Sequence, residues 1–177
     1  NIAGKRVLIT GASIGIGLAL AHAFLAKGAK VVITGRRADI LVEAKEDLRQ
    51  SSPSVWSVVA DVATADGRAA TLKQGIDALG GLDILVNNAG IETRYPFVET
   101  PNDVWQREIA VNLTGPFLCG KAAAKRMIGQ ARGGRIVNVS SIHEDVAAPT
   151  NAPYCAAKGG LRMLMRTMAV ELAPHEI

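Results

Sequence analysis

Short runs of apolar, often β-branched residues alternate along the chain with longer stretches in which apolar residues recur every three or four positions. The short runs predict buried strands at residues 5–10, 30–34, 55–60, 82–86 and 135–139. The longer stretches predict amphipathic helices, and glycine, serine or proline follows most of them. This alternation predicts an α/β fold with a doubly wound parallel sheet between two helical layers, a three-layer αβα arrangement.

The later helices carry two features of interest. A long helix begins at Thr100-Pro101 and continues to about Met127, and it contains Pro116, which has no N–H to donate to the carbonyl of Asn112. We therefore expect a kink there and a free Asn112 carbonyl that can hold a water molecule. The last helix begins at Pro153. Its predicted packed face is formed by Leu161, Leu164, Met165 and Met168.

Composition and charge narrow the class of protein. The 177 residues are 49% hydrophobic but only 4% aromatic, so we expect one domain, residues 1–177, with an aliphatic core. The net charge of +4 is spread along the chain, which gives no footprint for nucleic acid. No apolar run is long enough to predict a transmembrane helix, so we expect no membrane partner. Cys119 and Cys155 have no CxxC spacing and indicate a reduced, cytoplasmic protein.

The two ends of the chain suggest a piece of a longer protein. The sequence begins at Asn1 rather than at methionine, and it stops at Ile177 shortly after the last predicted helix. Another strand is expected at that point, so we interpret the chain as a domain that lacks its C-terminal part.

A glycine-rich turn joins the first strand to the first helix. It reads Gly11-Ala12-Ser13-Ile14-Gly15-Ile16-Gly17 and follows Thr10. Strand, glycine-rich turn and helix in this order are typical of a dinucleotide site, because glycines let the backbone approach a pyrophosphate at a helix N-terminus. The candidate cofactor-binding residues of this turn are Gly11, Ser13, Ile14, Gly15, Ile16 and Gly17.

The end of the second strand bears on the choice of dinucleotide. An acidic residue at this place accepts the ribose hydroxyl of NAD, whereas arginine suits the 2′-phosphate of NADP. Here the sequence has Gly35 followed by Arg36 and Arg37. We therefore favour NADP over NAD, although two solvated arginines at the start of a helix are the alternative.

Two further strands end in polar residues. Asp61-Val62 follows the third strand, where a carboxylate can accept from an adenine amino group or simply form a turn. Asn87-Asn88-Ala89-Gly90 follows the fourth strand, and its amide side chains can tie neighbouring loops together. An ordinary turn is the alternative there. The candidate cofactor contacts of these two segments are Asp61, Val62, Asn88, Ala89 and Gly90.

Tyr154 and Lys158 lie four residues apart in the last predicted helix and therefore on one face of it. A tyrosine titrates at about 10 when it is left alone, and a nearby cation lowers that pKa. The pair can therefore act as a general acid/base with its own electrostatic tuner. Taken alone, an aromatic ring packed under a solvated lysine explains it as well.

Together these motifs resemble the short-chain dehydrogenase/reductase family over essentially the whole chain, which implies a Rossmann-type fold. The resemblance rests on the glycine turn, Asp61-Val62, Asn87-Asn88-Ala89-Gly90, Asn112, Ser141 and Tyr154-x-x-x-Lys158. It implies a catalytic serine at Ser141, 13 residues before the tyrosine, and a proton donor at Tyr154. It further implies that Lys158 binds the nicotinamide ribose and tunes Tyr154, and that the Asn112 carbonyl holds a water in the proton relay.

Two local stretches, Asn87 to Glu92 and Ser140 to Glu144, resemble bacterial glucose 1-dehydrogenases. Glu92 and His143 are therefore candidate substrate residues, with solvated loop residues as the alternative. The resemblance implies hydride transfer between the nicotinamide C4 of NAD(P) and an alcohol or carbonyl such as a sugar. A 3-oxoacyl-carrier-protein reductase-like ketoreductase and an inactive nucleotide-binding protein remain alternatives. The resemblance also implies a homo-oligomer, and no cluster of His, Cys and Asp has the spacing of a metal site.

Overall fold

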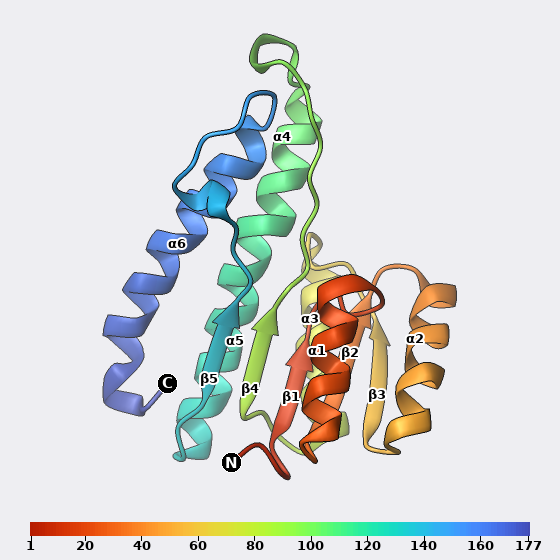
Figure 1. Ribbon diagram of the computed structural model, residues 1–177. Helices are drawn as coiled ribbons and strands as arrows, with labels where there is room; N and C mark the ends of the chain where they lie inside the picture. Colours follow the sequence, from red (N-terminus) through yellow and green to blue (C-terminus); the bar gives the residue numbers. More distant parts are fainter.

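The computed structural model describes residues 1–177, and its centre is a five-stranded sheet (Figure 1). The strands are β1 (Arg6–Ile9), β2 (Lys30–Gly35), β3 (Val55–Val59), β4 (Ile84–Asn87) and β5 (Arg135–Asn138). Every neighbouring pair is parallel, and the order across the sheet is β3-β2-β1-β4-β5. The five predicted strands and the parallel α/β fold are confirmed.

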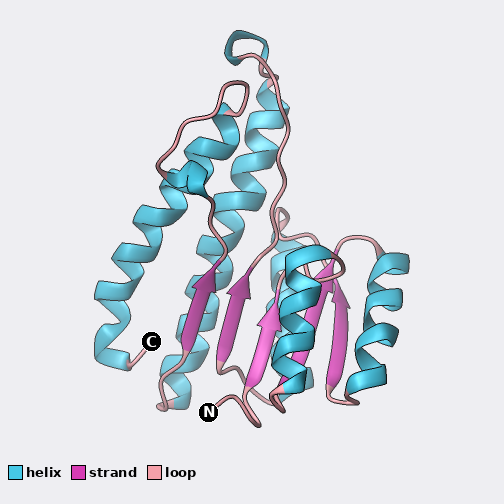
Figure 2. Ribbon diagram, viewed as in Figure 1, coloured by secondary structure: helices cyan, strands magenta, loops and turns pink.

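Helices cover both faces of this sheet (Figure 2). The α-helices are α1 (Gly15–Ala26), α2 (Ala38–Ser51), α3 (Ala65–Leu79), α4 (Asn102–Ile109), α5 (Gly115–Gln130) and α6 (Ala152–Leu172). Short 3-10 helices occupy η1 (Phe97–Glu99), η3 (Ile142–Glu144) and η4 (Ala173–His175), and a π-helix, η2 (Ala110–Thr114), separates α4 from α5. No helix is both long and apolar enough to cross a membrane.

Alternation along the strands divides the core between the two helical layers. Val7 and Ile9 of β1 point into one cluster with residues of α1 and α2, whereas Leu8 between them points into a second cluster with residues of α3 and α5. All three side chains are fully buried. The thiol of Cys119 is buried in the second cluster, which raises its pKa to about 11, and both cysteines are free.

Local chemistry explains where α3 begins and ends. The Thr64 side chain accepts a hydrogen bond from the Gly67 N–H at 3.0 Å, so Thr64 caps the start of the helix. A Cβ at Gly67 would lie 2.0 Å from the Asp61 carbonyl oxygen, so only glycine fits this first turn. At the other end Gly80 adopts a left-handed conformation with φ of 69° and stops the helix.

The long helix predicted from Thr100-Pro101 is interrupted where its proline predicted a kink. The interruption is the π-helix η2, in which the Gly115 N–H donates to the carbonyl of Ala110, five residues earlier. Pro116 then lies in the first turn of α5, where a missing N–H is tolerated. The kink therefore takes the form of a π-turn that leads directly into a new α-helix.

Helix α6 packs with a narrower stripe than the sequence predicted. Leu161 is 1% exposed, and Leu164 and Met168 are half-buried, in agreement with the predicted face. Met165 is 44% exposed, so its assignment to the packed face was wrong. Apolar residues lie around most of this helix, and its periodicity alone does not show which of them the neighbouring helices cover.

The strand order creates a crevice at the carboxyl edge of the sheet. From β1 the chain moves outward to β2 and β3, then returns to β4 on the other side of β1. Ile9 of β1 pairs with Ile33 of β2 and Val86 of β4, so the loops after all three strands emerge together. Ligands of doubly wound sheets bind at such a switch point.

Candidate active site

Close backbone contacts shape the glycine-rich turn after β1. Gly11 has a φ of +63°, and a Cβ there would lie 2.6 Å from the Cα of Ala89. A Cβ at Gly17 would lie 2.5 Å from the Asn88 amide nitrogen and 2.6 Å from the Gly11 carbonyl oxygen. Both contacts are shorter than packed atoms adopt, so this turn requires glycine at both positions.

Polar bonds lock the loop after β4 onto this turn. The Thr10 hydroxyl accepts from the backbone N–H groups of Asn88 and Ala89, each at 3.1 Å. The Asn88 amide donates to the carbonyls of Thr10 at 3.0 Å and Gly11 at 2.8 Å. Asn87 donates to the Asn138 side chain at 2.9 Å and so links β4 to β5. The predicted role of these asparagines as ties between loops is confirmed.

A cleft of about 330 Å³ opens above the turn. Most of the predicted cofactor residues line it: Gly11, Ser13, Ile14, Ile16, Arg36, Arg37, Asp61, Val62, Asn88, Ala89 and Gly90. Gly15 begins α1 and Gly17 is buried behind the cleft, so neither lines it. Ile14 caps α1 without a side-chain bond, and the first turn has no acidic residue. The N–H groups there are free for an anion, so the cleft fits a dinucleotide pyrophosphate.

Asp61 lies in this cleft with a partner that the sequence did not reveal. Its carboxylate accepts from the Arg107 guanidinium at 2.7 Å and from the Ala63 N–H at 2.9 Å. Burial raises the pKa of Asp61, but these two bonds and the charges of Arg107 and Arg36 outweigh it and hold the pKa below its ordinary value. Asp61 therefore presents a fixed negative charge at the edge of the cleft.

Tyr154 and Lys158 lie on one face of α6, as predicted from their spacing. The Lys158 ammonium is 5.4 Å from the centre of the Tyr154 ring and donates to the Val139 carbonyl at 2.8 Å. Lys158 is only 5% exposed. Burial lowers its pKa, and the negative charge of Glu144 opposes that change. The end of β5 therefore holds the ammonium beside the tyrosine.

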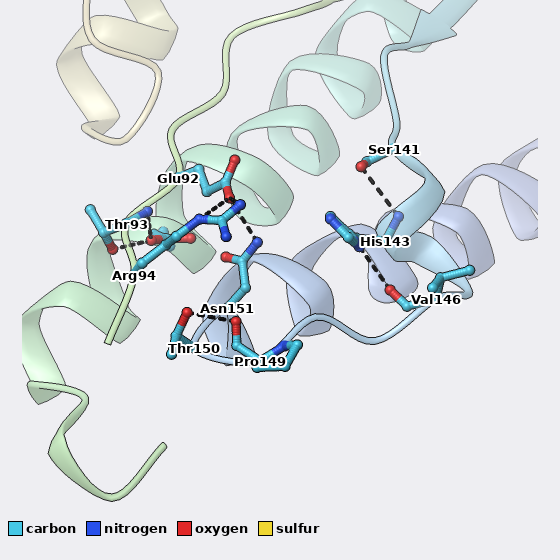
Figure 3. Close-up of polar contacts among 10 residues, drawn as sticks. Glu92, Thr93, Arg94, Ser141, His143, Val146, Pro149, Thr150 and Asn151 are labelled. Atoms are coloured by element: carbon cyan, nitrogen blue, oxygen red, sulfur yellow. Dashed lines mark hydrogen bonds and ion pairs between the residues drawn. The ribbon is translucent and has the colours of Figure 1, made fainter. Parts of the chain in front are cut away.

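Ser141 caps the start of η3, in the loop that also holds His143 (Figure 3). Its hydroxyl oxygen accepts from the His143 N–H at 3.2 Å, and the His143 ring packs edge-on against Tyr154 with 6.2 Å between ring centres. The Val146 carbonyl lies 2.8 Å from Nδ1 of His143 and can only accept, so Nδ1 carries a proton and Nε2 of the neutral ring can accept. The structure thus brings Ser141, His143 and Tyr154 to one place.

The sequence model described as short chain dehydrogenase matches residues 5–177, nearly the whole chain. The chain belongs to this family. Its members are NAD(P)-dependent oxidoreductases of alcohols and carbonyls, and so is this dehydrogenase.

Two curated relatives illustrate the similarity. The 5-keto-D-gluconate 5-reductase of Escherichia coli strain K12 is 37% identical over 177 residues, which are 100% of this chain and 69% of the relative. Glucose 1-dehydrogenase 2 of Bacillus subtilis strain 168 is 36% identical over 183 residues, again 100% of this chain and 69% of the relative. The predicted resemblance to glucose 1-dehydrogenases is therefore confirmed. They are one of several kinds of sugar-related enzyme that this chain resembles.

Solved structures show the same fold. A gluconate 5-dehydrogenase from Burkholderia cenocepacia J2315, in complex with NADP and tartrate, superposes with a TM-score of 0.90 at 37% identity and covers 98% of this chain and 68% of that one. An NAD⁺-bound xylitol dehydrogenase superposes with a TM-score of 0.94 at 32% identity and covers 100% of this chain and 68% of that one. Neighbours of this dehydrogenase thus include complexes with either nucleotide.

Asn112 is fully buried in η2, and its side chain has a structural role beyond the one predicted. The amide donates to the Ile91 carbonyl at 2.8 Å and accepts from the Ile91 N–H at 2.9 Å. It therefore fixes the segment that leaves β4 toward the active site. The role of the Asn112 carbonyl in holding a water stays a prediction.

Glu108, one turn before Asn112, holds the same segment and was missed by the sequence analysis. It is fully buried, and one carboxylate oxygen accepts from the Thr93 N–H at 2.7 Å and from the Thr93 hydroxyl. Ile91 and Thr93 are thus both bound to the helix, which leaves Glu92 between them to point away from it. A Glu and an Asn spaced by four in a helix are the only sequence signal for this clamp.

Glu92 lies where this segment meets the loop before α6 (Figure 3). One of its carboxylate oxygens accepts from the Asn151 amide at 2.9 Å and from the Arg94 guanidinium at 2.8 Å. The Tyr95 N–H donates to the Thr150 carbonyl at 2.9 Å, so the two loops are joined. One carboxylate oxygen of Glu92 therefore binds neighbouring side chains, and its second oxygen has no hydrogen bond.

The structure has no group of three or more His, Cys, Asp or Glu side chains arranged to hold a metal ion. The polar groups near Tyr154 include hydroxyl, ammonium and amide groups. These groups can bind an oxygen atom, stabilise charge on it and move a proton to or from it.

Proposed function

We propose that this dehydrogenase uses NADP in preference to NAD and interconverts an alcohol and a carbonyl on a sugar or sugar acid. When bound, the nicotinamide supplies or accepts the hydride at its C4 atom. The observation that carries the proposal is that one chain contains both a cleft that fits a dinucleotide and the Tyr154–Lys158 pair with Ser141 nearby in the η3 loop. The cofactor preference and the substrate rest on further residues.

Preference for NADP is supported by the end of β2. Gly35 stands where an acidic residue would accept the ribose hydroxyl of NAD, and both Arg36 and Arg37 line the cleft beside it. Two guanidinium groups favour a 2′-phosphate, because each can form paired, charge-assisted bonds to its oxygens. The gluconate 5-dehydrogenase whose structure contains NADP agrees with this choice. The xylitol dehydrogenase binds NAD⁺, so the preference of this chain has to be measured.

The proton chemistry follows from the positions of three side chains. In the reductive direction Ser141 and Tyr154 donate hydrogen bonds to the substrate carbonyl oxygen, where negative charge develops. Tyr154 then delivers its proton to that oxygen. The nearby Lys158 ammonium stabilises the tyrosinate that remains. We assign proton resupply to Lys158 and to a water on the Asn112 carbonyl, and the oxidative direction reverses each step.

The polar groups of Glu92 and His143 favour a substrate rich in hydroxyls. The unbonded oxygen of Glu92 and Nε2 of His143 are both acceptors, which suits the hydroxyls of a sugar or polyol. Arg94, whose side chain is 63% exposed, favours a second candidate, a sugar acid with a carboxylate. The names of the two gluconate-related enzymes among the relatives support this second candidate.

We further propose that residues 1–177 form a single NAD(P)-binding domain, that the protein is cytoplasmic, and that it assembles as a homo-oligomer. The outward face of α6 supports assembly, because Met163 and Val170 are 57% and 78% exposed there. Size-exclusion chromatography with light scattering tests the oligomer directly.

A substrate panel with each nucleotide tests the activity. We expect turnover with NADP or NADPH on gluconate, 5-ketogluconate, glucose or xylitol, and little on a 3-oxoacyl thioester. Turnover on the thioester alone would favour the ketoreductase alternative. Nucleotide binding without turnover on any of these substrates would favour a binding protein.

Arg36 and Arg37 give the test of cofactor choice. Replacing both by Gln should weaken NADP by about tenfold or more and leave NAD nearly unchanged, since only the 2′-phosphate contacts are lost. Isothermal titration of each variant with both nucleotides measures the ratio. Arg49, an exposed arginine at the end of α2, provides the matched control as Arg49→Gln. Equal losses for NADP and NAD would contradict the assignment.

A further inference from the structure

The carboxylate of Glu144 lies in η3 and takes no part in binding the substrate oxygen. One of its oxygens accepts from the Ser140 hydroxyl, and the other lies 3.7 Å from Nε of Arg162. The Glu144 side chain is 27% exposed, so solvent reaches only part of it. A carboxylate held on both sides in a partly buried position has a defined location and orientation.

Helix α6 presents three functional side chains at intervals of one turn. Tyr154, Lys158 and Arg162 are each four residues apart and therefore follow one another along a single face. Glu144 belongs to η3, which packs against α6 here: Arg162 pairs with Glu144, and a Cβ at Gly159, next to Lys158, would lie 3.6 Å from the Glu144 carbonyl oxygen. The acid is thus next to a row of cations and the catalytic phenol.

We propose that Glu144 is a positioning residue that provides the counter-charge of the buried Lys158 ammonium, and that Ser140 and Arg162 hold its carboxylate in place. The proposal rests on the proposed function only in that Lys158 serves Tyr154. It gives the two adjacent serines different roles: Ser141 binds the substrate oxygen, and Ser140 orients the carboxylate of Glu144.

The physical need for a counter-charge is clear from the surroundings of Lys158. A buried ammonium loses hydration, and its bonded partner is the Val139 carbonyl, which is a dipole without net charge. Burial lowers the pKa of Lys158, and Glu144 is the group whose charge raises it again. Without that charge the lysine would lose its proton at lower pH and would no longer stabilise tyrosinate.

Other charged and titratable groups lie on α6 and on the elements packed against it, which include η3 and α4. The buried one on α4 is Glu108, whose carboxylate is bonded to Thr93. On α6 they are Tyr154 and Arg162, and around η3 they are His143, Glu144 and Asp145. Asp145 also pairs with Arg162, but its side chain is 59% exposed, so solvent screens its charge. Two neighbouring acids thus share one arginine, and only the less exposed of them acts on Lys158.

This difference supplies a matched pair of variants, Glu144→Gln and Asp145→Asn. Each removes one negative charge from the same turn and keeps the side-chain shape. We expect the pKa of Lys158 to fall by about one unit in the first variant and to stay unchanged in the second. Incorporating ¹³Cε-labelled lysine and following its NMR shift with pH measures this pKa directly, with the Lys158 resonance identified by Lys158→Arg.

The NMR titration answers without turnover, so it separates this inference from the proposed function. If the enzyme is active, the alkaline limb of its kcat profile should move to lower pH in Glu144→Gln by the same amount. Ser140→Ala provides a second variant should Glu144→Gln fold poorly, and it should move the pKa of Lys158 in the same direction by less. An unchanged pKa of Lys158 in Glu144→Gln, or equal shifts in the two acid variants, would overturn the proposal.

Discussion

The cofactor cleft and the proposed catalytic edge of the sheet, where Tyr154 and Lys158 lie near the end of β5, are built by different means. Around the cleft, β1 and β4 are almost completely buried, and glycine backbone contacts set the shape. At the catalytic edge, β5 is half open and its Val137 is 46% exposed. Side-chain bonds hold the groups there, such as Lys158 to the Val139 carbonyl. The cleft should therefore respond mainly to changes in volume, and the edge mainly to changes in polar groups and charge.

The largest effect is expected from Tyr154→Phe at the catalytic edge. Loss of the general acid should lower kcat by about 10²- to 10⁴-fold, while NADPH affinity changes little because the cleft is untouched. Steady-state kinetics and nucleotide titration measure the two quantities. The other tyrosine of the chain, Tyr95, is the control, and Tyr95→Phe should keep most of the activity. Near-normal turnover by Tyr154→Phe would refute the assigned role.

Gly17→Ala should do the opposite and damage the cleft. The new Cβ would meet the Asn88 amide and the Gly11 carbonyl, which must move apart at a cost of about 1–3 kcal/mol in stability. NADPH affinity should fall by about tenfold, because the moved groups shape the phosphate site. Calorimetric titration and thermal unfolding test both parts. If the variant binds NADPH normally, the cleft is more adaptable than its contacts suggest.

The Arg6–Asp83 pair sharpens the comparison, because it is an ion pair on the two strands that border the cleft. Arg6 begins β1, and Asp83 directly precedes β4. Bonds from Arg6 at 2.6 and 2.8 Å lower the pKa of Asp83 to about 2, against burial that raises it. Since the folded pKa is below the unfolded value of about 4, the stabilisation is present above pH ~4 and is lost toward pH ~2.

Asp83→Asn should therefore lower the free energy of unfolding by about 2 kcal/mol at neutral pH. The difference from the original chain should shrink as the pH falls through this window. Denaturant unfolding at several pH values measures it. A constant difference down to pH ~2 would show that Asp83 acts by shape rather than by charge.

The smallest effect is expected from Gly129→Ala, which is the control for Gly17→Ala. Gly129 lies in α5, and a Cβ there would meet nothing within 4 Å. The alanine should stabilise the protein by about 0.5–1 kcal/mol through higher helix propensity, with NADPH affinity unchanged. A small rise in the unfolding temperature is the expected reading, and a fall would mean that α5 is not helical there.

The strands and the glycine turn could be predicted from the sequence, because each depends on residues that are neighbours along the chain. Residues 5–10 form a strand for reasons of length and apolarity, and Tyr154 and Lys158 share a face because a helix has a fixed period. The cap of α3 is also local, because the Thr64 side chain accepts a bond from the Gly67 N–H three residues later.

The contacts that the sequence analysis missed join residues distant along the chain. Asp61 meets Arg107, and Glu92 meets Asn151, only after several helices have packed. The same is true of the exposed side of α6, where Met165 was assigned wrongly. For such pairs each side chain has many possible partners, and the sequence does not rank them.

The sequence by itself determined the fold class, the dinucleotide turn and the shared helix face of Tyr154 and Lys158, because local spacing and hydrophobicity specify them. Only the tertiary structure decided how Glu108 and Asn112 clamp the segment after β4, and that Glu144 lies beside the catalytic helix. The physical reason is that a hydrogen bond or ion pair acts over a few ångströms. Its partners are therefore settled only when packing brings separate elements together.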